Sequence, residues 1–232
     1  KSIGIHLHHA MIVAGIGIEP DKLRLVQNPA GGTFGYKFSP TMEALLGVAC
    51  LALDGRPCSL VYNMHQSITY TGKRSPGFMH VKMAADENGK LLALWGDNYI
   101  DHGPYSEFGD LLTMRLSQFT GAGYEIRNIR NKSQTVATNH AWGSAFRAYG
   151  SPQSFMGSEV CMDVLAAKMG IDPFELRFRN IYRPGVTTPT GQTPDVYCLE
   201  QMYEKARPYY EEAKARCAEL NAKSDGRYKY GV

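Results

Sequence analysis

A glycine-rich loop near the start of the chain is the feature that most limits how this sequence can fold. Residues 31–38 read GGTFGYKF, with three glycines in five positions. Glycine has no Cβ, so it reaches positive φ and lets a ligand touch the main chain. Residues 23–26 before the loop alternate like a strand, and Ser39 and Pro40 after it are typical of a helix start. The stretch therefore predicts a strand, a glycine loop and a helix N-terminus, where backbone N–H groups attract anions or polar cofactor atoms.

Two common phosphate-binding loops do not fit this stretch. The G-x-G-x-x-G spacing of dinucleotide-binding proteins is absent, and no Gly-Lys-Ser/Thr ends the loop as it does in P-loop proteins. On these residues alone, a tight turn without a ligand is an equally good interpretation.

Composition and charge exclude several classes of partner. The 232 residues are 44% hydrophobic and 20% charged, which is usual for a globular chain long enough to bury a full core. The 25 basic and 22 acidic residues are scattered without a long run, so we expect no nucleic-acid partner. No apolar run reaches the roughly 18 residues that a membrane span needs, so we expect no membrane partner.

The cysteines indicate the compartment, and the chain ends indicate whether the sequence is part of a longer polypeptide. The five cysteines form no C-x-x-C pair, and this odd, dispersed count predicts free buried thiols in a reducing, cytoplasmic setting. The chain begins at Lys1 without a signal pattern and stops at Val232 within a polar stretch. We therefore expect a piece of a longer polypeptide, with part of any active site outside it.

Three histidines lie close together in an apolar segment, residues 5–16, whose spacing predicts a helix. Only His6 and His9 share a spacing that metal ligands use on helices, and no carboxylate joins them. We therefore expect capping or core roles for these two and for His8, with a metal site as the minor alternative. His80, in a predicted strand, is expected to be a surface residue rather than a ligand.

The remaining segments predict an α+β fold. A hairpin is expected from strands over 79–83 and 90–99 around the turn at 86–89. Ser106 is expected to cap a helix on which Phe108, Leu111 and Leu112 share one face, and from the pattern alone this face is a core stripe. Other helices are expected over 40–53, 152–169, 172–178 and 199–221, and other strands over 59–62, 124–129 and 133–137. We predict a two-layer helix-on-sheet sandwich.

A second glycine-punctuated loop leads into the predicted helix at 152–169. Residues 145–153 read AFRAYGSPQ. They resemble the A-F-R-G-F-G-x-P-Q loop of the molybdenum hydroxylases, the xanthine oxidase and aldehyde oxidoreductase family, and residues 31–37 resemble that family's G-G-x-F-G-x-K loop. The resemblance covers essentially the whole chain. It is strongest to the aldehyde-oxidising members of sulfate-reducing bacteria, because YKF and RAY replace the GKE and RGF of purine-oxidising members.

The resemblance implies a cofactor and a set of site residues. It implies that residues 1–232 are one cofactor-binding segment of a larger molybdopterin-binding subunit. The cofactor would be molybdopterin cytosine dinucleotide carrying molybdenum, with no side-chain ligand to the metal. In the family, main chain at positions matching Phe34, Gly35 and Arg147 lies against the inorganic ligands of the metal. The positions that match the substrate funnel are Phe38, Phe108, Leu111 and Tyr149.

The resemblance also implies an activity. The whole protein would be a molybdenum-dependent aldehyde oxidoreductase that makes carboxylic acids with oxygen from water. Phe38 stands where purine-oxidising members carry a glutamate, and an apolar residue there favours aldehydes over purines because a purine's polar edge would lose its partner. With no charged partner in the funnel wall, the phenol of Tyr149 would be its only polar tip.

This segment alone would be catalytically incomplete. No carboxylate here matches the family's general-base glutamate, and the cysteine motifs of its iron–sulfur clusters are absent. We expect the base and the [2Fe–2S] clusters in other domains of the same polypeptide, which are its expected partners together with the aldehyde. A homodimer is compatible with the resemblance, and the oligomeric state stays open. The alternative from another class is a non-catalytic binding or assembly module whose glycine loops are structural turns.

Two structural predictions follow from the pair of loops. The backbone of Gly35 should lie near that of Arg147, around one shared cavity. Arg147, always charged and set between Phe146 and Tyr149, is expected to be buried and paired with a carboxylate.

Overall fold

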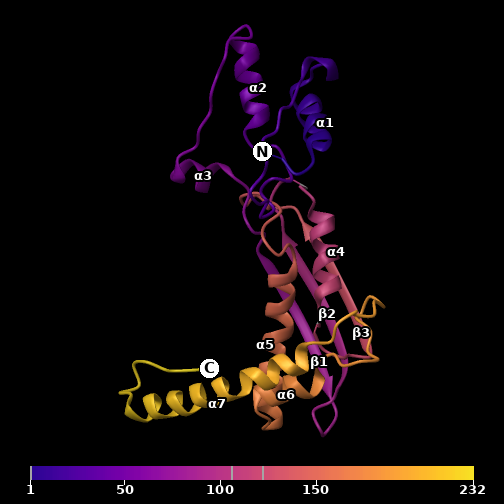
Figure 1. Cartoon of the computed structure of the whole chain (residues 1–232), viewed down its shortest axis with the longest axis vertical. Helices are drawn as coiled ribbons and strands as arrows, with labels where there is room; N and C mark the ends of the chain where they lie inside the picture. The colour runs from indigo at the N-terminus through magenta and orange to yellow at the C-terminus, as the bar shows by residue number, and fades with distance from the viewer. Residues whose placement is uncertain (1, 106, 122) are drawn as a thin grey trace. The chain divides into compact units, whose positions relative to one another are not determined.

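The computed structural model describes residues 2–105, 107–121 and 123–232, as helices on a small sheet (Figure 1). None of the helices in these ranges is both long and apolar enough to cross a membrane. The elements in chain order are α1 (Ile5–Ile16), the 3-10 helix η1 (Pro20–Lys22), α2 (Glu43–Ala52), α3 (Met64–Tyr70), β1 (Gly77–Ala85), β2 (Leu91–Asp101), α4 (Gly109–Phe119), β3 (Asn128–Val136), α5 (Ser151–Met169), α6 (Pro173–Asn180) and α7 (Leu199–Lys223).

The chain divides into two compact units, and the three strands and α5 each contribute residues to both. Unit 1 contains both glycine loops, α1 to α4 and the first turns of α5. Unit 2 contains the β1–β2 turn, most of α5, and α6 and α7. Unit 1 comprises Lys1–His80, Gly96–Thr120 and Asn131–Met156, and unit 2 comprises Val81–Trp95, Gly121–Arg130 and Gly157–Val232.

The sheet has the order β1-β2-β3. Strands β1 and β2 form the predicted hairpin, in which Asp86 N donates to Lys90 O at 2.9 Å and Gly89 takes φ +80°. At the other end Asp101 N donates to Pro76 O at 3.0 Å. Between these pairs β1 advances ten residues and β2 eleven, so β2 carries one extra residue, which defines a β-bulge.

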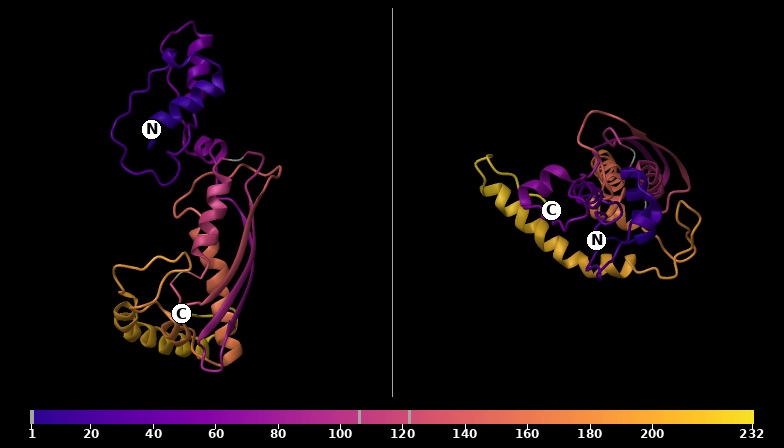
Figure 2. Two further views of the ribbon diagram at one scale, coloured as in Figure 1. Left: turned by 90° about the vertical axis from the view of Figure 1, so that its right-hand side faces the viewer. Right: turned by 90° about the horizontal axis from the view of Figure 1, so that it is seen from above.

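Strands β2 and β3 run parallel. Asn128 Nδ2 at the start of β3 donates to Leu92 O near the start of β2, at 3.0 Å. Just past the end of β2, His102 N donates to Val136 O at the end of β3, at 3.1 Å. Parallel neighbours need a crossover connection, and α4 supplies it, lying along the sheet (Figure 2).

The core of unit 1 lies between α4 and the sheet. Ile100 of β2 and Leu112 and Leu116 of α4 are at most 2% exposed, with Met79 and Tyr149 packed against them. The predicted core stripe is therefore correct for Leu112, and it continues to Leu116 one turn later.

The core of unit 2 lies between the hairpin and helices α5 and α6. Leu91, Leu94, Met162 and Leu176 are buried there together with Ala166, Tyr124, Ile126 and Ile181. Asn180, fully buried at the end of α6, fastens this core. Its side chain accepts from Leu91 N at 2.8 Å and donates to Gly89 O at 2.7 Å and Leu176 O at 2.9 Å.

The helix-on-sheet α+β prediction is confirmed, with local corrections. Residues 23–26 and 59–62 are not strands, because they lack a partner strand in the described part of the chain. A single strand, β3, replaces the two expected over 124–137, and α3, closed by an Asn63–Gln66 capping box, was not predicted. Ser106 lies outside the described residues. Helix α4 begins at Gly109, so Phe108 precedes it.

The start of α2 also differs from the prediction. The helix begins at Glu43 rather than at Pro40. The Glu43 carboxylate accepts from Thr41 N at 2.9 Å and from Met42 N at 3.2 Å. A carboxylate that satisfies free N–H groups stabilises a helix start, so these bonds set the first turn three residues later than proline and serine suggested.

The three clustered histidines lie on α1. His8 is buried, and His9 Nε2 lies 3.0 Å from the carbonyls of Pro20 and Leu23, so the expected capping and core roles are confirmed for these two. The described residues contain no cluster suited to a metal.

All five cysteines are free thiols, as predicted, but four are half-buried and Cys198 is exposed, so the expectation of buried thiols was wrong.

Candidate functional site

The two glycine loops of unit 1 contact each other at Gly35. This residue takes φ +89°, and a Cβ built on it would lie 2.4 Å from Ala145 O and 2.8 Å from Phe146 N. Only glycine fits such an approach of two backbones. The prediction that the loops meet in space is thereby confirmed, from segments more than a hundred residues apart in the sequence.

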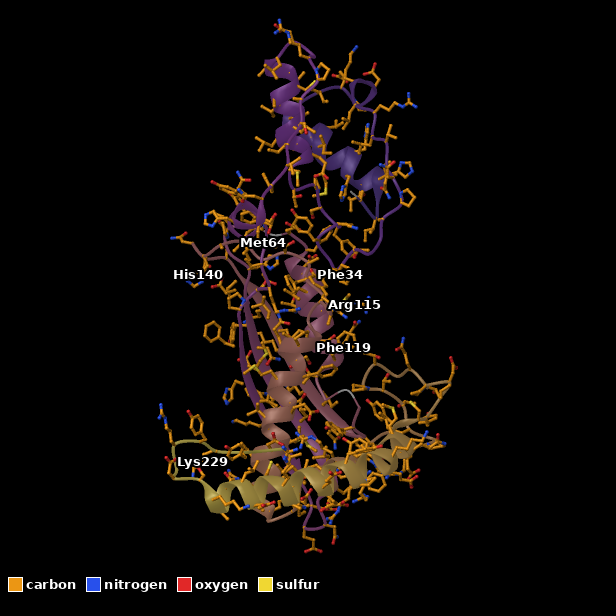
Figure 3. All side chains as sticks on the ribbon, turned by 60° about the vertical axis from the view of Figure 1, so that its left-hand side comes forward. Phe34, Met64, Arg115, Phe119, His140 and Lys229 are labelled. Atoms are coloured by element: carbon orange, nitrogen blue, oxygen red, sulfur yellow. The ribbon has the colours of Figure 1, made fainter. Side chains whose placement is uncertain are left out.

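A cavity of about 390 Å³ opens where the loops meet. Aromatic rings and two arginines contribute to its wall, and none of the described residues on the wall carries a carboxylate. Figure 3 shows Phe34, Arg115 and Phe119 following one another along the same side. The cavity is lined by Thr33, Phe34, Gly35, Phe38, Arg115, Phe119, Ala145, Phe146, Arg147, Ala148, Tyr149 and Ser151.

A larger hollow, of about 550 Å³, lies in unit 2 and contains neither loop. Its wall is formed by neighbouring stretches of β1, of β2, and of β3 with the residue before it, and Lys82 lies over the Trp95 ring there at 5.1 Å. We place the candidate site at the smaller cavity, because both recognisable motifs converge on it.

The backbone of both loops is strained at the cavity. Phe34 and Ala148 have φ of +51° and +66°, values that side-chain-bearing residues rarely adopt. Among the described residues, none accepts a hydrogen bond from the N–H groups of Phe34, Phe146 or Arg147. Strain and unused donors at one cavity indicate a binding site rather than a mere turn.

Arg147 corrects the sequence prediction. Its side chain is exposed, and the described part of the chain offers it no carboxylate within ion-pair distance. Its guanidinium lies 5.6 Å from the centre of the Phe34 ring, which is a cation–π contact between the two loops. The expected burial and ion pair were wrong because residues 147–150 form a surface turn.

Arg74 supports the second loop and was missed by the sequence analysis. Its guanidinium donates to Arg147 O and lies 4.7 Å from the centre of the Phe146 ring. Partial burial lowers the pKa of this arginine, although it remains charged at neutral pH. Arg74 therefore fixes the loop carbonyl and leaves the neighbouring N–H groups available.

The first loop is held by the N-terminal helix. Nε2 of His8, which is 1% exposed, lies 2.7 Å from the carbonyl oxygen of Phe38. Ile3 N donates to Lys37 O at 3.1 Å. A donor behind each carbonyl fixes the direction of Phe38, whose ring meets Phe108 edge-to-face at 5.9 Å.

Tyr149 is oriented by the segment before α4. Its hydroxyl donates to Phe108 O. Burial, with the charges of Asp110 and Glu107 adding to it, raises the pKa of this phenol well above its ordinary value, so it stays neutral. The phenol is thus engaged with the protein at the cavity wall that Tyr149 lines.

Helix α4 adds residues that the sequence analysis did not name. Leu111 is half-buried and is not among the residues that line the cavity, whereas Arg115 and Phe119 are. These three residues are four apart, so they share one helix face. The signal that could have found Arg115 and Phe119 was this continuation of the Leu111 face by two turns. Arg115 also gives the wall a cation, so the wall is not purely apolar as predicted.

The donor set of this cavity fits an anionic, oxygen-rich cofactor. The wall offers unbonded N–H groups from both loops, two cations and no carboxylate among the described residues. Such donors bind phosphate and oxo groups without reorganisation. The polar groups of a molybdopterin match this chemistry, and the aromatic rings suit an apolar substrate beside it.

The comparison with protein families decides the assignment. Residues 1–181 match the family described as the molybdopterin cofactor-binding domain. This chain belongs to that family. The match includes both glycine loops and the residues that line the cavity, and it confirms the molybdenum hydroxylase resemblance that the loops predicted.

Several proteins are similar over most of this chain. The aldehyde oxidoreductase of Megalodesulfovibrio gigas is 59% identical over the whole chain, which covers 25% of that protein. The structure of the aldehyde oxidoreductase from Desulfovibrio desulfuricans superposes with a TM-score of 0.87, at 61% identity, over 94% of this chain and 24% of that one. The large molybdopterin subunit of nicotinate dehydrogenase from Eubacterium barkeri is 28% identical over 87% of this chain and 48% of that protein.

The chain thus spans a quarter to a half of the length of these relatives. It corresponds to a fragment of the larger aldehyde oxidoreductase chains, as the fold prediction stated.

Proposed function

We propose that this chain is the cofactor-facing segment of a molybdenum-containing aldehyde oxidoreductase, which oxidises aldehydes to carboxylic acids with water as the oxygen source. The observation that carries the proposal is the contact of Gly35 with Ala145, which brings the unbonded N–H groups of both loops to one cavity. The identity of 59% to an aldehyde oxidoreductase supports the choice of activity.

The bound molybdenum cofactor would supply the two-electron oxidation, and the protein would supply binding and orientation. Main chain at Phe34, Gly35 and Arg147 would hold the anionic groups of the cofactor. The N–H donors of Phe34 and Arg147 are unbonded and fixed in place before it binds, whereas Gly35 N donates to Thr33 Oγ1 at 3.1 Å and its lack of a side chain permits close approach. Arg147 and Arg115 would add positive charge to the cavity wall.

The substrate would lie against the aromatic wall of the same cavity. Phe38 and Tyr149 line it, and Phe108 supports Phe38 from behind. Such a wall gains roughly 25 cal/mol for each Å² of apolar substrate surface that it covers. It would also exclude water from the reacting aldehyde. Leu111, which matches a funnel position in the family, would reach this wall only after a local shift.

Some parts of the proposal rest on the family resemblance alone. These are the cytosine dinucleotide form of the cofactor, and the [2Fe–2S] clusters and general-base glutamate in other domains of the same polypeptide. The interpretation of residues 1–232 as a single cofactor-binding segment has the same basis. The cytoplasmic location rests on the five free thiols. A homodimer of the full-length protein is compatible with the same resemblance.

Substrate choice tests the proposal at Phe38. In the full-length enzyme we expect kcat/KM for benzaldehyde to exceed that for xanthine by about tenfold or more, since a purine leaves polar groups unpaired against this wall. Phe38→Glu should lower aldehyde kcat/KM by about tenfold, because a carboxylate replaces apolar surface. Phe78→Glu, the same change at an exposed phenylalanine of β1, is the control and should change neither value.

Two outcomes would count against this proposal. If the wild-type enzyme has equal kcat/KM for xanthine and benzaldehyde, Phe38 does not line the substrate wall. A full-length protein that purifies without molybdenum after growth with molybdate would favour the alternative, a binding or assembly module whose loops are structural turns.

A further inference from the structure

Helix α2 of unit 1 ends in a cap that reverses the chain. Gly55 N donates to Cys50 O at 2.9 Å, and Asp54 and Gly55 take φ of +50° and +77°. This six-residue closure by left-handed residues is the Schellman type of helix end, after which the chain leaves in a new direction. Residues 56–58 are thereby led back toward the helix that they have just left.

The reversal brings two thiols together. Cys58 Sγ lies 3.7 Å from Leu46 O, and Cys50 Sγ lies 3.8 Å from Arg56 O. Leu46 and Cys50 are one turn apart on the same face of α2. Cys50 is also close enough to Cys58 to affect its pKa. Each sulfur therefore contacts the segment that carries the other, in an arrangement set by the backbone of the cap.

Both thiols are free, and each is partly accessible to solvent. Burial raises the pKa of Cys58, and the neighbouring Cys50 adds to the effect, so this thiol is protonated at neutral pH. A pair of protonated thiols reacts slowly by itself. It closes once an exchange partner converts one of the thiols into a mixed disulfide.

We propose that Cys50 and Cys58 form a reversible disulfide in exchange with a low-molecular-weight disulfide such as oxidised glutathione. The thiolate of one cysteine attacks the glutathione disulfide, forms a mixed disulfide and releases one glutathione thiolate. The thiolate of the second cysteine attacks the protein sulfur of that mixed disulfide and releases the other glutathione. Two protein thiols are oxidised, one glutathione disulfide is reduced to two thiols, and the protons pass to the released glutathione.

The consequence is a covalent tie between the end of α2 and the segment that follows it. The loop closed by this bond is short, so the tie restrains local fraying rather than the whole unfolded chain. This inference is independent of the proposed catalytic function, since none of its residues lines the loop cavity.

Peptide mapping of the full-length protein tests the proposal. Trypsin cuts after Lys37 and Lys73 and resists cutting at Arg56 because Pro57 follows, so both cysteines fall on one peptide, residues 38–73. The native protein is incubated with oxidised glutathione, its remaining thiols are alkylated with iodoacetamide, and it is then digested. We expect peptide 38–73 to be two hydrogens lighter than its reduced form and unalkylated, and to accept two alkyl groups after reduction with dithiothreitol.

Two comparisons make the test decisive. The exposed Cys198 should stop at a mixed disulfide with glutathione. In Cys58→Ser, Cys50 should likewise stop at the mixed disulfide. The proposal is overturned if peptide 38–73 carries two alkyl groups, or two glutathiones, while Cys198 is fully modified. It is also overturned if Cys50 in the Cys58→Ser variant carries no glutathione and still resists alkylation.

Discussion

The loop cavity of unit 1 and the core of unit 2 differ in whether their polar groups have hydrogen-bond partners. In unit 2, Arg177 bonds the carboxylates of Glu159 at 2.8 Å and Asp163 at 2.7 Å, and the Tyr124 hydroxyl donates to Glu159 at 2.8 Å. Buried Asn180 likewise uses both ends of its amide. In the loop cavity, three N–H groups lack an acceptor among the described residues, and Phe34 is 63% exposed at positive φ.

This difference separates stability from function. A core whose charged and amide side chains are paired is organised for folding, whereas strain and unused backbone donors persist only where the surrounding structure holds them for another purpose. Substitutions in the unit 2 core should therefore lower the free energy of unfolding with little direct effect on cofactor binding. Substitutions in the loops should do the reverse.

The largest expected effect is the loss of stability of the unit 2 core in Asn180→Leu. Leucine leaves Leu91 N and Gly89 O buried without a partner, at about 1–3 kcal/mol for each such group, whereas Leu176 O keeps its backbone bond within α6. We expect the free energy of unfolding, measured by urea denaturation, to fall by roughly 3 kcal/mol or more. Asn139→Leu, at an exposed asparagine after β3, is the control and should change it by less than about 1 kcal/mol. If the two substitutions lower the free energy of unfolding equally, the buried hydrogen bonds of Asn180 do not stabilise the unit 2 core.

The next effect concerns the loop contact, in Gly35→Ala. Any alanine at positive φ costs about 1–2 kcal/mol, and here its Cβ also meets the backbone of Ala145. We expect the full-length protein to retain less than about a tenth of its molybdenum, since each tenfold corresponds to about 1.4 kcal/mol. Gly191→Ala is matched to it, because Gly191 has φ +79° and open space around it. If both variants keep the same metal content, the contact between the loops is not needed for cofactor binding.

A smaller effect is expected for Arg147→Ala. With no carboxylate partner, the side chain contributes its cation–π contact with Phe34, roughly 0.5–1 kcal/mol at an exposed site, and a positive charge that solvent screens. Cofactor affinity, measured by the loss of molybdenum on dilution, should fall by about two- to fivefold. Arg227→Ala removes a comparable contact with Tyr228 near the end of the chain and should leave affinity unchanged. A hundredfold or larger loss of cofactor affinity would contradict this account, because an exposed cation–π contact is too weak to cause it.

The smallest effect is a pH dependence at Asp101, behind the segment that leads to the second loop. The Thr138 hydroxyl bonds this carboxylate and lowers its pKa, with Gly103 N and His140 contributing. Because the native pKa is lowered, this stabilisation is complete above about pH 4 and is lost as the pH falls through the native pKa. In Asp101→Asn, the acid part of the plot of melting temperature against pH should be flatter than in wild type. Asp54→Asn, at an exposed carboxylate, should leave the plot unchanged.

The sequence predicted this molecule unevenly, for physical reasons. The hairpin and α5 to α7 were found because their periodicity and turn residues agree with the tertiary structure. Residues 23–26 and 59–62 have strand-like patterns but no neighbouring strand in the described structure, and a strand without a partner is not stable. Local pattern cannot show whether a partner exists.

The candidate site was predicted in part. The contact at Gly35 could be inferred, because glycine spacing reports close backbone approach. The exposure of Arg147 could not, because it depends on how the turn at 147–150 meets solvent. Arg74 contacts the second loop from more than seventy residues away, and no local signal reports such a contact.

Hydrogen–deuterium exchange on the full-length protein tests most directly whether the free N–H groups of the two loops hold the cofactor. Exchange is compared between the molybdenum-loaded protein and protein from cells grown without molybdate. We predict that amides at 33–37 and 145–149 exchange at least about tenfold more slowly in the loaded protein, whereas those at 159–168 in α5 exchange equally in both, because helix hydrogen bonds already protect them. Equal exchange of the loop amides in the two preparations would contradict the account.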